Sequence, residues 1–261
     1  MLAPERHTFI LEELARRGVV RIASVADELS VSEMTVRRDL EQLSDQGLLN
    51  KVHGGATVKV DTAQVTEPPF RTKSLREQGA KEAIAAAAAT MVEPSDAVAL
   101  MGGSTVFALA KRLTSVPRLT IVTNSLPISD LFQREGRSDQ TVILAGGLRT
   151  PTDSLVGEIT VSIFDRLNID VVFMGAHGMD LKSGFTSPNL LEAETNRAVQ
   201  SRAKKLVVLA DHTKWGEVAF STFANLSDAQ TLITDDGLSD DAVAQLRGSI
   251  GEVQVVKNQR A

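Results

Sequence analysis

Residues 31–57 have the sequence VSEMTVRRDLEQLSDQGLLNKVHGGAT. The spacing of their apolar residues changes half-way, and this change decides the fold of the N-terminal part of the chain. In the first half, Val36, Leu40 and Leu43 recur at helical spacing, and Ser32 stands where a helix N-cap is expected. In the second half, apolar residues alternate on either side of the turn sequence HGG, which is typical of a β-hairpin. The stretch therefore predicts a helix followed by a hairpin.

Two more helices are predicted ahead of this stretch. Residues 5–17 repeat apolar side chains at helical spacing and stop at Gly18. Residues 23–30, ASVADELS, predict a short helix with Ser24 as its N-cap. Three helices and a hairpin in so short a segment predict a winged helix-turn-helix domain over residues 1–60.

Two adjacent arginines, Arg37 and Arg38, interrupt the apolar spacing of the predicted third helix. Arginines beside an aspartate can simply form a solvated face with an Arg–Asp pair along the helix. The short helix before them and the hairpin after them favour a recognition helix, whose start contacts base edges in DNA. The net charge is −5, and the first 60 residues carry eight basic and nine acidic side chains. Any DNA contact must therefore come from local placement rather than from bulk charge.

The N-terminal sequence also resembles a known family. Residues 5–56, ERHTFILEELARRGVVRIASVADELSVSEMTVRRDLEQLSDQGLLNKVHGGA, are similar to the N-terminal signature of the DeoR family of bacterial transcriptional regulators. The resemblance implies a regulator whose partner is double-stranded operator DNA. It implies contacts with DNA from the recognition helix through Ser32, Thr35, Arg37 and Arg38, and from the wing through Lys51 and His53. Because one recognition helix covers only a half-site, we expect a homodimer or homotetramer.

The composition of the sequence and the pattern of its apolar residues change after the predicted hairpin. Residues 61–80 combine two prolines with mixed charge and little periodicity, which predicts a linker. Over residues 81–261, an alanine-rich helix is followed by seven apolar runs, AVALM, LTIVT, TVILA, VVFMGA, KLVVLA, TLIT and EVQVV, most of them separated by helix-length stretches. Continuous apolar runs that alternate with helices predict an α/β domain with a largely parallel, Rossmann-like sheet covered on both faces.

Polar loops follow several of these apolar runs. GGST at 102–105 ends a predicted strand and begins a helix, a place where backbone amides and two hydroxyls can hold a phosphate. An ordinary strand-to-helix turn with a Ser or Thr cap has the same sequence, so this turn alone leaves both interpretations open. Similar loops stand at 123–125 (TNS), 145–147 (AGG), 175–178 (GAHG) and 210–214 (ADHTK). Ligands collect at the carboxyl ends of strands in an open parallel sheet, so we expect these loops to converge on one site.

These loops, together with SLVG at 154–157 and EAETNRAV at 192–199, resemble the C-terminal effector domain of the same family. That domain is similar in fold to sugar-phosphate isomerases, and the resemblance implies a phosphorylated sugar as the effector. It implies that Gly103, Ser104, Thr105 and Lys214 hold the phosphate and that Asn124 and Glu192 lie nearer the hydroxyls. His177 is either a ligand contact or a structural hydrogen-bonding residue.

Two functions fit this organisation. The first is a repressor of carbohydrate metabolism genes that a phosphorylated sugar relieves. The alternative is an active sugar-phosphate isomerase with an accessory DNA-binding domain, in which Glu192 would be the base that moves a proton between adjacent carbons. Ribose-phosphate isomerases carry an Asp-rich loop of the DGADE type where this chain has GAHG. We therefore favour the regulator and predict no enzymatic activity.

No cofactor and no metal ion are predicted. The chain has no cysteine, and its four histidines show no metal-ligand spacing. Charges interrupt the apolar run at the N-terminus, and no uncharged run reaches the roughly 18 residues of a membrane span. We expect a cytoplasmic protein.

Overall fold

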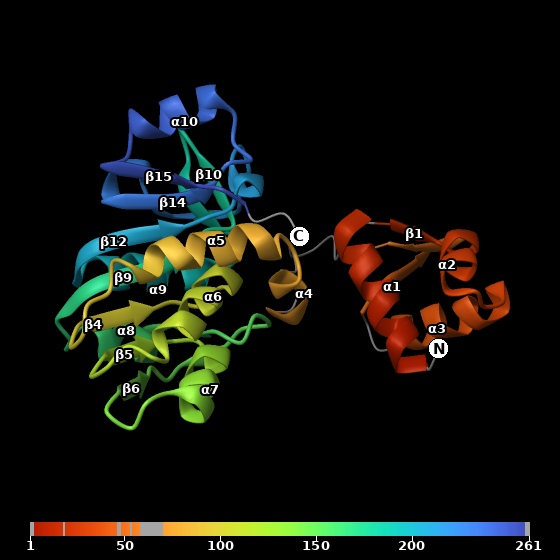
Figure 1. The fold of residues 1–261 in the computed structure, drawn as a ribbon, viewed down its shortest axis with the longest axis horizontal. Coiled ribbons are helices and arrows are strands. Elements are labelled where there is room, and N and C mark those ends of the chain that lie inside the picture. The colour runs from red at the N-terminus through yellow and green to blue at the C-terminus, as the bar shows by residue number, and fades with distance from the viewer. Residues whose placement is uncertain (1–2, 18, 46–47, 53, 58–69, 259–261) are drawn as a thin grey trace. The chain divides into compact units, whose positions relative to one another are not determined.

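The structure is a computed structural model that describes residues 3–17, 19–45, 48–52, 54–57 and 70–258. The chain divides into two compact units, Met1–Arg76 and Glu77–Ala261 (Figure 1). Each unit has its own hydrophobic core. Within the described ranges, no helix is long and apolar enough to cross a membrane.

The first unit is a winged helix-turn-helix, as predicted. Its elements are α1 (Ala3–Arg17), β1 (Val19–Arg21), α2 (Ile22–Leu29), α3 (Glu33–Asp45), β2 (Asn50–Val52), β3 (Gly55–Thr57) and α4 (Phe70–Ser74). The three strands form one antiparallel sheet in the order β1-β3-β2. The sequence does not predict β1, because a strand of three residues is too short to show an alternating pattern.

The start of α2 differs from the prediction. Ser24 is not its N-cap, because the helix begins at Ile22 and Ser24 lies within its first turn. The residue at the N-cap is Arg21, which ends β1 and makes no capping hydrogen bond with its side chain. Instead, the Ile22 N–H donates to the Gly54 carbonyl at 2.9 Å. The turn of the wing thus satisfies one of the amides that a helix start leaves free.

The predicted start and inward face of α3 are confirmed. The Thr35 N–H donates to Ser32 Oγ at 3.2 Å, so Ser32 caps the helix. Val36, Leu40 and Leu43 are buried. They belong to a core made of Ile10, Leu14, Val20, Val25, Ala26, Val36, Leu40, Leu43, Leu49 and Ala56. This shared core packs α3 against the other helices and the wing.

The second unit is an α/β domain, as predicted. Its elements are α5 (Gln78–Ala89), β4 (Ala97–Leu100), α6 (Ser104–Leu113), β5 (Thr120–Thr123), α7 (Leu126–Glu135), β6 (Thr141–Leu144), β7 (Leu148–Arg149), β8 (Leu155–Val156), α8 (Glu158–Phe164), β9 (Ile169–Gly175), β10 (Gly178–Asp180), β11 (Gly184–Ser187), α9 (Leu190–Gln200), β12 (Ala203–Leu209), the 3-10 helix η1 (His212–Lys214), β13 (Ser221–Ala224), the 3-10 helix η2 (Leu226–Asp228), β14 (Thr231–Asp235), α10 (Asp240–Arg247) and β15 (Glu252–Val256). All seven apolar runs form strands of one parallel sheet, in the order β15-β14-β12-β9-β4-β5-β6. Three short strands form a separate antiparallel sheet, β10-β11-β13.

Both faces of the large sheet are covered, which explains why its strands read as continuous apolar runs. On β9, Val171 and Phe173 belong to a core cluster that includes residues of α5, α6 and α7. Val172 and Met174 alternate with these two residues along β9. They belong to a second cluster that includes residues of α8, α9 and α10. Successive side chains of a strand point to opposite faces, so a central strand buried on both sides needs apolar residues at every position.

The predicted linker is only partly covered by the structure. Residues 61–69 lie outside the described residues. The remaining part, 70–80, contains α4 and the first residues of α5, so helical structure begins inside the segment that we assigned to the linker.

Candidate functional site

The start of α3 presents two arginines to solvent. Arg37 and Arg38 are both exposed, whereas Asp39, the next residue, is buried. Arg37 Nη2 lies 3.6 Å from Glu33 Oε2, and both side chains are 56% exposed. An exposed pair of this kind contributes at most about 1 kcal/mol, so it leaves Arg37 available for a stronger partner.

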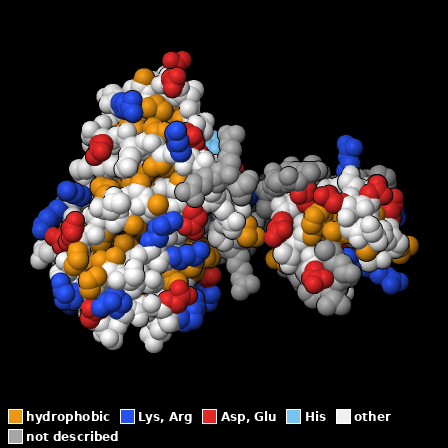
Figure 2. All heavy atoms as spheres, viewed as in Figure 1, with side chains coloured by type: hydrophobic (Ala, Val, Ile, Leu, Met, Phe, Trp, Pro, Cys, Tyr) orange, Lys and Arg blue, Asp and Glu red, His pale blue; other side chains and the backbone are white. Residues whose placement is uncertain are grey.

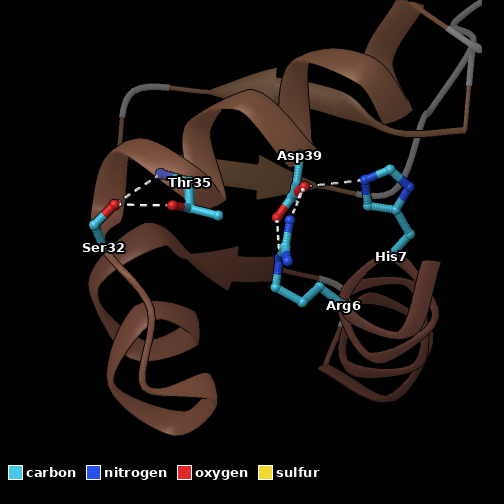
Figure 3. Close-up of polar contacts among 5 residues, drawn as sticks. All are labelled: Arg6, His7, Ser32, Thr35 and Asp39. Atoms are coloured by element: carbon cyan, nitrogen blue, oxygen red, sulfur yellow. Dashed lines mark hydrogen bonds and ion pairs between the residues drawn. The ribbon is translucent and has the colours of Figure 1, made fainter. Parts of the chain in front are cut away.

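Asp39 does not pair with the arginines beside it. Its carboxylate accepts hydrogen bonds from Arg6 Nε at 2.7 Å and Arg6 Nη2 at 2.9 Å, and His7 Nε2 lies 3.1 Å from it (Figure 3). Burial alone would raise the pKa of Asp39, but the hydrogen bonds and charges of Arg6 and His7 outweigh it and hold that pKa below its ordinary value. The partners of Asp39 thus lie on α1, and the pair along the helix does not form.

The predicted contacts Ser32 and Thr35 lie together at the start of α3. Their hydroxyl oxygens are 2.9 Å apart, and Ser32 Oγ also accepts the Thr35 N–H (Figure 3). A helix start of this kind, with hydroxyls and backbone amides, is suited to a phosphate of the DNA backbone.

The wing contributes one described basic residue near α3. Lys51, on β2, donates to Glu41 Oε1 on α3 at 2.7 Å. The hydrogen bond from Lys51, together with its charge, lowers the pKa of Glu41. His53, the other predicted wing contact, lies outside the described residues.

Charges of both signs are scattered over the face drawn in Figure 2, where Lys and Arg side chains and Asp and Glu side chains are seen on both units. This agrees with the net charge of −5 and with a DNA contact that depends on a few placed side chains.

In the second unit, two of the predicted effector loops, GGST after β4 and GAHG at the end of β9, lie at a point where the strand order reverses. From β4 the sheet continues through β5 and β6 on one side, and through β9, β12, β14 and β15 on the other. The loops after β4 and β9 approach closely, since a Cβ atom on Gly103 would lie 4.0 Å from the Gly175 Cα. The crevice between two such strands, at their carboxyl ends, is where open α/β sheets bind ligands.

Ser104 and Thr105 begin α6 at this crevice. The N-cap is Gly103, which has no side chain to satisfy the first-turn amides. By contrast, α7 and α9 are capped by their own Ser125 and Asn189 side chains. The start of α6 therefore combines free amides, two hydroxyls and the positive end of the helix dipole.

Asn124, the residue after β5, joins the loop after β4 to β8. Its Oδ1 accepts the Gly102 N–H at 2.9 Å, and its Nδ2 donates to the Leu155 carbonyl at 2.9 Å. Gly102 packs so tightly that a Cβ atom there would overlap the Ser154 hydroxyl. Asn124 is 3% exposed, so the predicted contact with an effector hydroxyl would use the remaining hydrogen-bonding capacity of an amide that already positions two backbone segments.

Glu192 lies in the first turn of α9, half-buried. Its Oε1 accepts from the Thr152 hydroxyl at 2.9 Å, and its Oε2 accepts from the Ser187 hydroxyl at 3.2 Å. The carboxylate thus joins α9 to the segment before β8 and to the end of β11. Its partners lie on other elements, so it does not form a pair along its own helix.

Lys214 ends η1, at the carboxyl end of β12. In the part of the chain that the structure describes, its ammonium group forms no ion pair. β12 is separated from β4 by β9, which puts the two strands about 10 Å apart. A ligand held by both Ser104 and Lys214 would therefore span the carboxyl end of β9.

Comparisons with known proteins agree with this two-part architecture. Residues 6–62 match the DeoR-like helix-turn-helix domain, and residues 76–236 match the DeoR C terminal sensor domain. The chain belongs to the DeoR family of transcriptional regulators. The second unit of this regulator is therefore a sensor domain, and the first is a DNA-binding domain.

Relatives of similar length share this organisation. The uncharacterized HTH-type transcriptional regulator YgbI of Escherichia coli is 34% identical, over 99% of this chain and 100% of the relative. The lactose phosphotransferase system repressor of Streptococcus mutans is also 34% identical, over 90% of this chain and 93% of the relative. Among solved structures, ribose 5-phosphate isomerase A from Methanocaldococcus jannaschii is 17% identical, over 52% of this chain and 53% of the isomerase, with a TM-score of 0.39.

Sequence reasoning missed one polar pair of this regulator. His212 precedes Lys214 by two residues and is hydrogen-bonded to the buried Asp235, at the end of β14. Asp235 follows the apolar run TLIT, so the same rule that singled out the other polar loops applies to it. In the described ranges, no group of three or more His, Cys, Asp or Glu side chains is arranged to hold a metal ion.

Proposed function

We propose that this DeoR-family regulator represses genes of carbohydrate metabolism and that a phosphorylated sugar relieves the repression. The name of the Streptococcus mutans relative, a lactose phosphotransferase system repressor, supports the first part. The proposal places the regulator in the cytoplasm, with its operator DNA.

The DNA-binding part of the proposal rests on α3. Its exposed Arg37 and Arg38 would read base edges, while Ser32 and Thr35 at the helix start would hold a phosphate. Lys51, and His53 in the same hairpin, would contact the backbone from the wing. Two copies of the chain would place two such helices on the two halves of an operator.

One observation carries the effector part: the uncapped start of α6 faces the crevice between β4 and β9, and Lys214 on the same edge of the sheet has no acidic partner among the described residues. Free amides, hydroxyls and an ammonium group at one edge suit a phosphate better than a neutral ligand. In this proposal Gly103, Ser104, Thr105 and Lys214 hold the phosphate, and Asn124 and Glu192 lie near the sugar hydroxyls.

The sensor domain is proposed to bind its sugar phosphate without converting it. A base for isomerisation must reach a substrate proton, but both oxygens of Glu192 already accept hydrogen bonds from Thr152 and Ser187. Those bonds suit a carboxylate that shapes a binding site.

Thermal-shift measurements against a panel of phosphosugars test the proposal. A ligand at 100 times its Kd stabilises the folded state by about 2.7 kcal/mol, which gives a measurable rise in melting temperature. We expect one or a few phosphosugars to raise it and their unphosphorylated forms to have no effect. The same phosphosugar should then weaken binding to operator DNA. A panel without any stabilising phosphosugar would contradict the effector assignment.

A further inference from the structure

Asp39 is an acidic residue on the apolar side of α3. It follows Val36 by three residues and precedes Leu40, and all three side chains are buried. An ion pair in such a place contributes little net stability, because well-packed apolar residues of similar volume do as well or better. A leucine at this position would extend the apolar stripe, so stability alone does not explain the carboxylate.

The contacts of Asp39 are directional in a way that apolar contacts are not. Arg6 Nε and Nη2 reach different carboxylate oxygens, at 2.7 and 2.9 Å, while His7 Nε2 lies 3.1 Å from the oxygen that Nη2 also contacts (Figure 3). A forked guanidinium matches a carboxylate in one plane and one orientation. The hydrophobic effect, in contrast, has no preferred direction. The three side chains therefore restrict both the rotation of α3 about its own axis and its slide along α1.

This restriction acts at the residues that face DNA. Arg37 and Arg38 immediately precede Asp39, so a rotation of the helix at Asp39 moves both of them by the same angle. A bidentate contact between an arginine and a guanine tolerates little displacement, because both hydrogen bonds need good geometry.

We propose that Arg6, His7 and Asp39 are positioning residues for DNA recognition: they lock the recognition helix onto α1 in the one orientation that brings Arg37 and Arg38 to the base edges. This inference rests on the proposed reading of DNA by α3. It assigns to α1 a part in base preference as well as in folding.

A double replacement separates positioning from stability. Arg6→Met/Asp39→Leu removes the directional ion pair and replaces both partners with apolar side chains of similar size, so the first unit should still fold. The matched control is Arg137→Met/Asp139→Leu, because Arg137 and Asp139 form a comparable two-bond pair, at 2.8 and 3.0 Å, on the exposed surface of the sensor domain.

The probe is a duplex enriched by the wild-type protein from a random-sequence library. The full-length variants are titrated with this duplex and with its single-base substitutions, and their melting temperatures are measured. Wild-type enrichment of a defined sequence tests the proposed function, so its failure is distinguishable from a failure of this inference.

We expect the Arg6→Met/Asp39→Leu variant to melt near the wild-type temperature but to lose on the order of tenfold in discrimination between the enriched duplex and its single-base variants. The control variant should keep wild-type discrimination. If the double variant does not fold, Arg6→Lys keeps the charge and loses the fork, and we expect the same loss of discrimination from it. Wild-type base preference in a folded Arg6→Met/Asp39→Leu variant, or in Arg6→Lys where the former does not fold, would overturn the proposal.

Discussion

His212 and Asp235 form a hydrogen-bonded pair between η1, which follows β12, and the end of the neighbouring strand β14. Nδ1 of His212 lies 2.8 Å from Asp235 Oδ2, and the His212 N–H donates to Oδ1 at 2.7 Å. The Asp235 side chain is 1% exposed, whereas that of His212 is 31% exposed. Both oxygens of a buried carboxylate thus hold one residue of η1, and this fixes the short segment that carries Lys214.

Replacing His212 with alanine should destabilise the sensor domain. The change removes one of the two hydrogen bonds of the buried Asp235 carboxylate, and such a loss costs about 1–3 kcal/mol. Calorimetry of the full chain should show a lower melting temperature. Lys205→Ala, which changes an exposed residue of β12, is the control. Equal melting temperatures for His212→Ala and Lys205→Ala would show that the pair adds no stability.

Replacing either exposed arginine of α3 should weaken operator binding and leave the fold intact. A bidentate arginine–guanine contact contributes about 1–3 kcal/mol of discrimination. Arg37→Ala and Arg38→Ala should each lose affinity for the enriched duplex by this amount in fluorescence anisotropy titrations, at unchanged melting temperature. Arg134→Ala, an exposed arginine on α7, should bind as the wild type does. Unchanged affinity in both α3 variants would remove these residues from the interface.

Glu41→Gln should increase affinity for DNA. Glu41 Oε1 lies 2.7 Å from Lys51 Nζ, and the negative charge of Glu41 repels the phosphate backbone of DNA. The neutral amide would release Lys51 for a phosphate, so affinity should rise and its salt dependence should steepen by about one phosphate contact. Titrations with DNA at several salt concentrations measure both effects. A variant that binds no better than the wild type would place Lys51 and Glu41 away from the DNA.

The first unit should lose stability in acid through Asp39. Its pKa is lowered in the folded state, so its contribution is present above the unfolded pKa of about 3.9 and is lost as pH falls through the folded value. Circular dichroism melts of the full chain between neutral pH and pH 3 should show this loss in the transition of the first unit. In Asp39→Asn that transition should depend less on pH, although it should start lower. An identical pH dependence in both proteins would exclude Asp39 as the group responsible.

Much of the fold could be predicted because buried helices and strands show a regular pattern of apolar residues in the sequence. The inner strands of the parallel sheet are largely buried on both faces and therefore read as apolar runs. The edge strands β6 and β15 are more exposed but also have largely apolar sequences. The strands β10, β11 and β13 have the sequences GMD, GFTS and STFA, which are too short and too mixed to show such a pattern. β1 and the start of α2 depend on hydrogen bonds with the wing, and no local sequence pattern encodes a partner more than 30 residues away.

The residues of the candidate sites also fall into two groups, those that the sequence predicts and those that it does not. The GGST turn and Lys214 stand next to apolar runs, so a rule about strand ends finds them. The pairing of His212 with Asp235 requires knowledge that β12 and β14 are neighbours, which only the sheet order supplies. The partners of Asp39 on α1 lie 32 and 33 residues away, so no local pattern in the sequence predicts them.

Lys214→Ala should abolish the response to the effector and spare DNA binding. Lys214 lies at the carboxyl end of β12 and has no acidic partner among the described residues, so we expect its loss to weaken the proposed phosphate contact and to leave no buried charge behind. An effector acts only through a difference in its affinity for the two arrangements of the protein, and a coupling of about 1–3 kcal/mol would give roughly 5- to 150-fold release of the operator. By linkage, operator DNA should weaken effector binding by the same factor in the wild type.

Titrations of operator DNA with and without the stabilising phosphosugar measure the response of Lys214→Ala. Lys182→Ala, on an exposed turn of the sensor domain, is the control. A Lys214→Ala protein that releases DNA at the wild-type effector concentration would move the phosphate site away from η1.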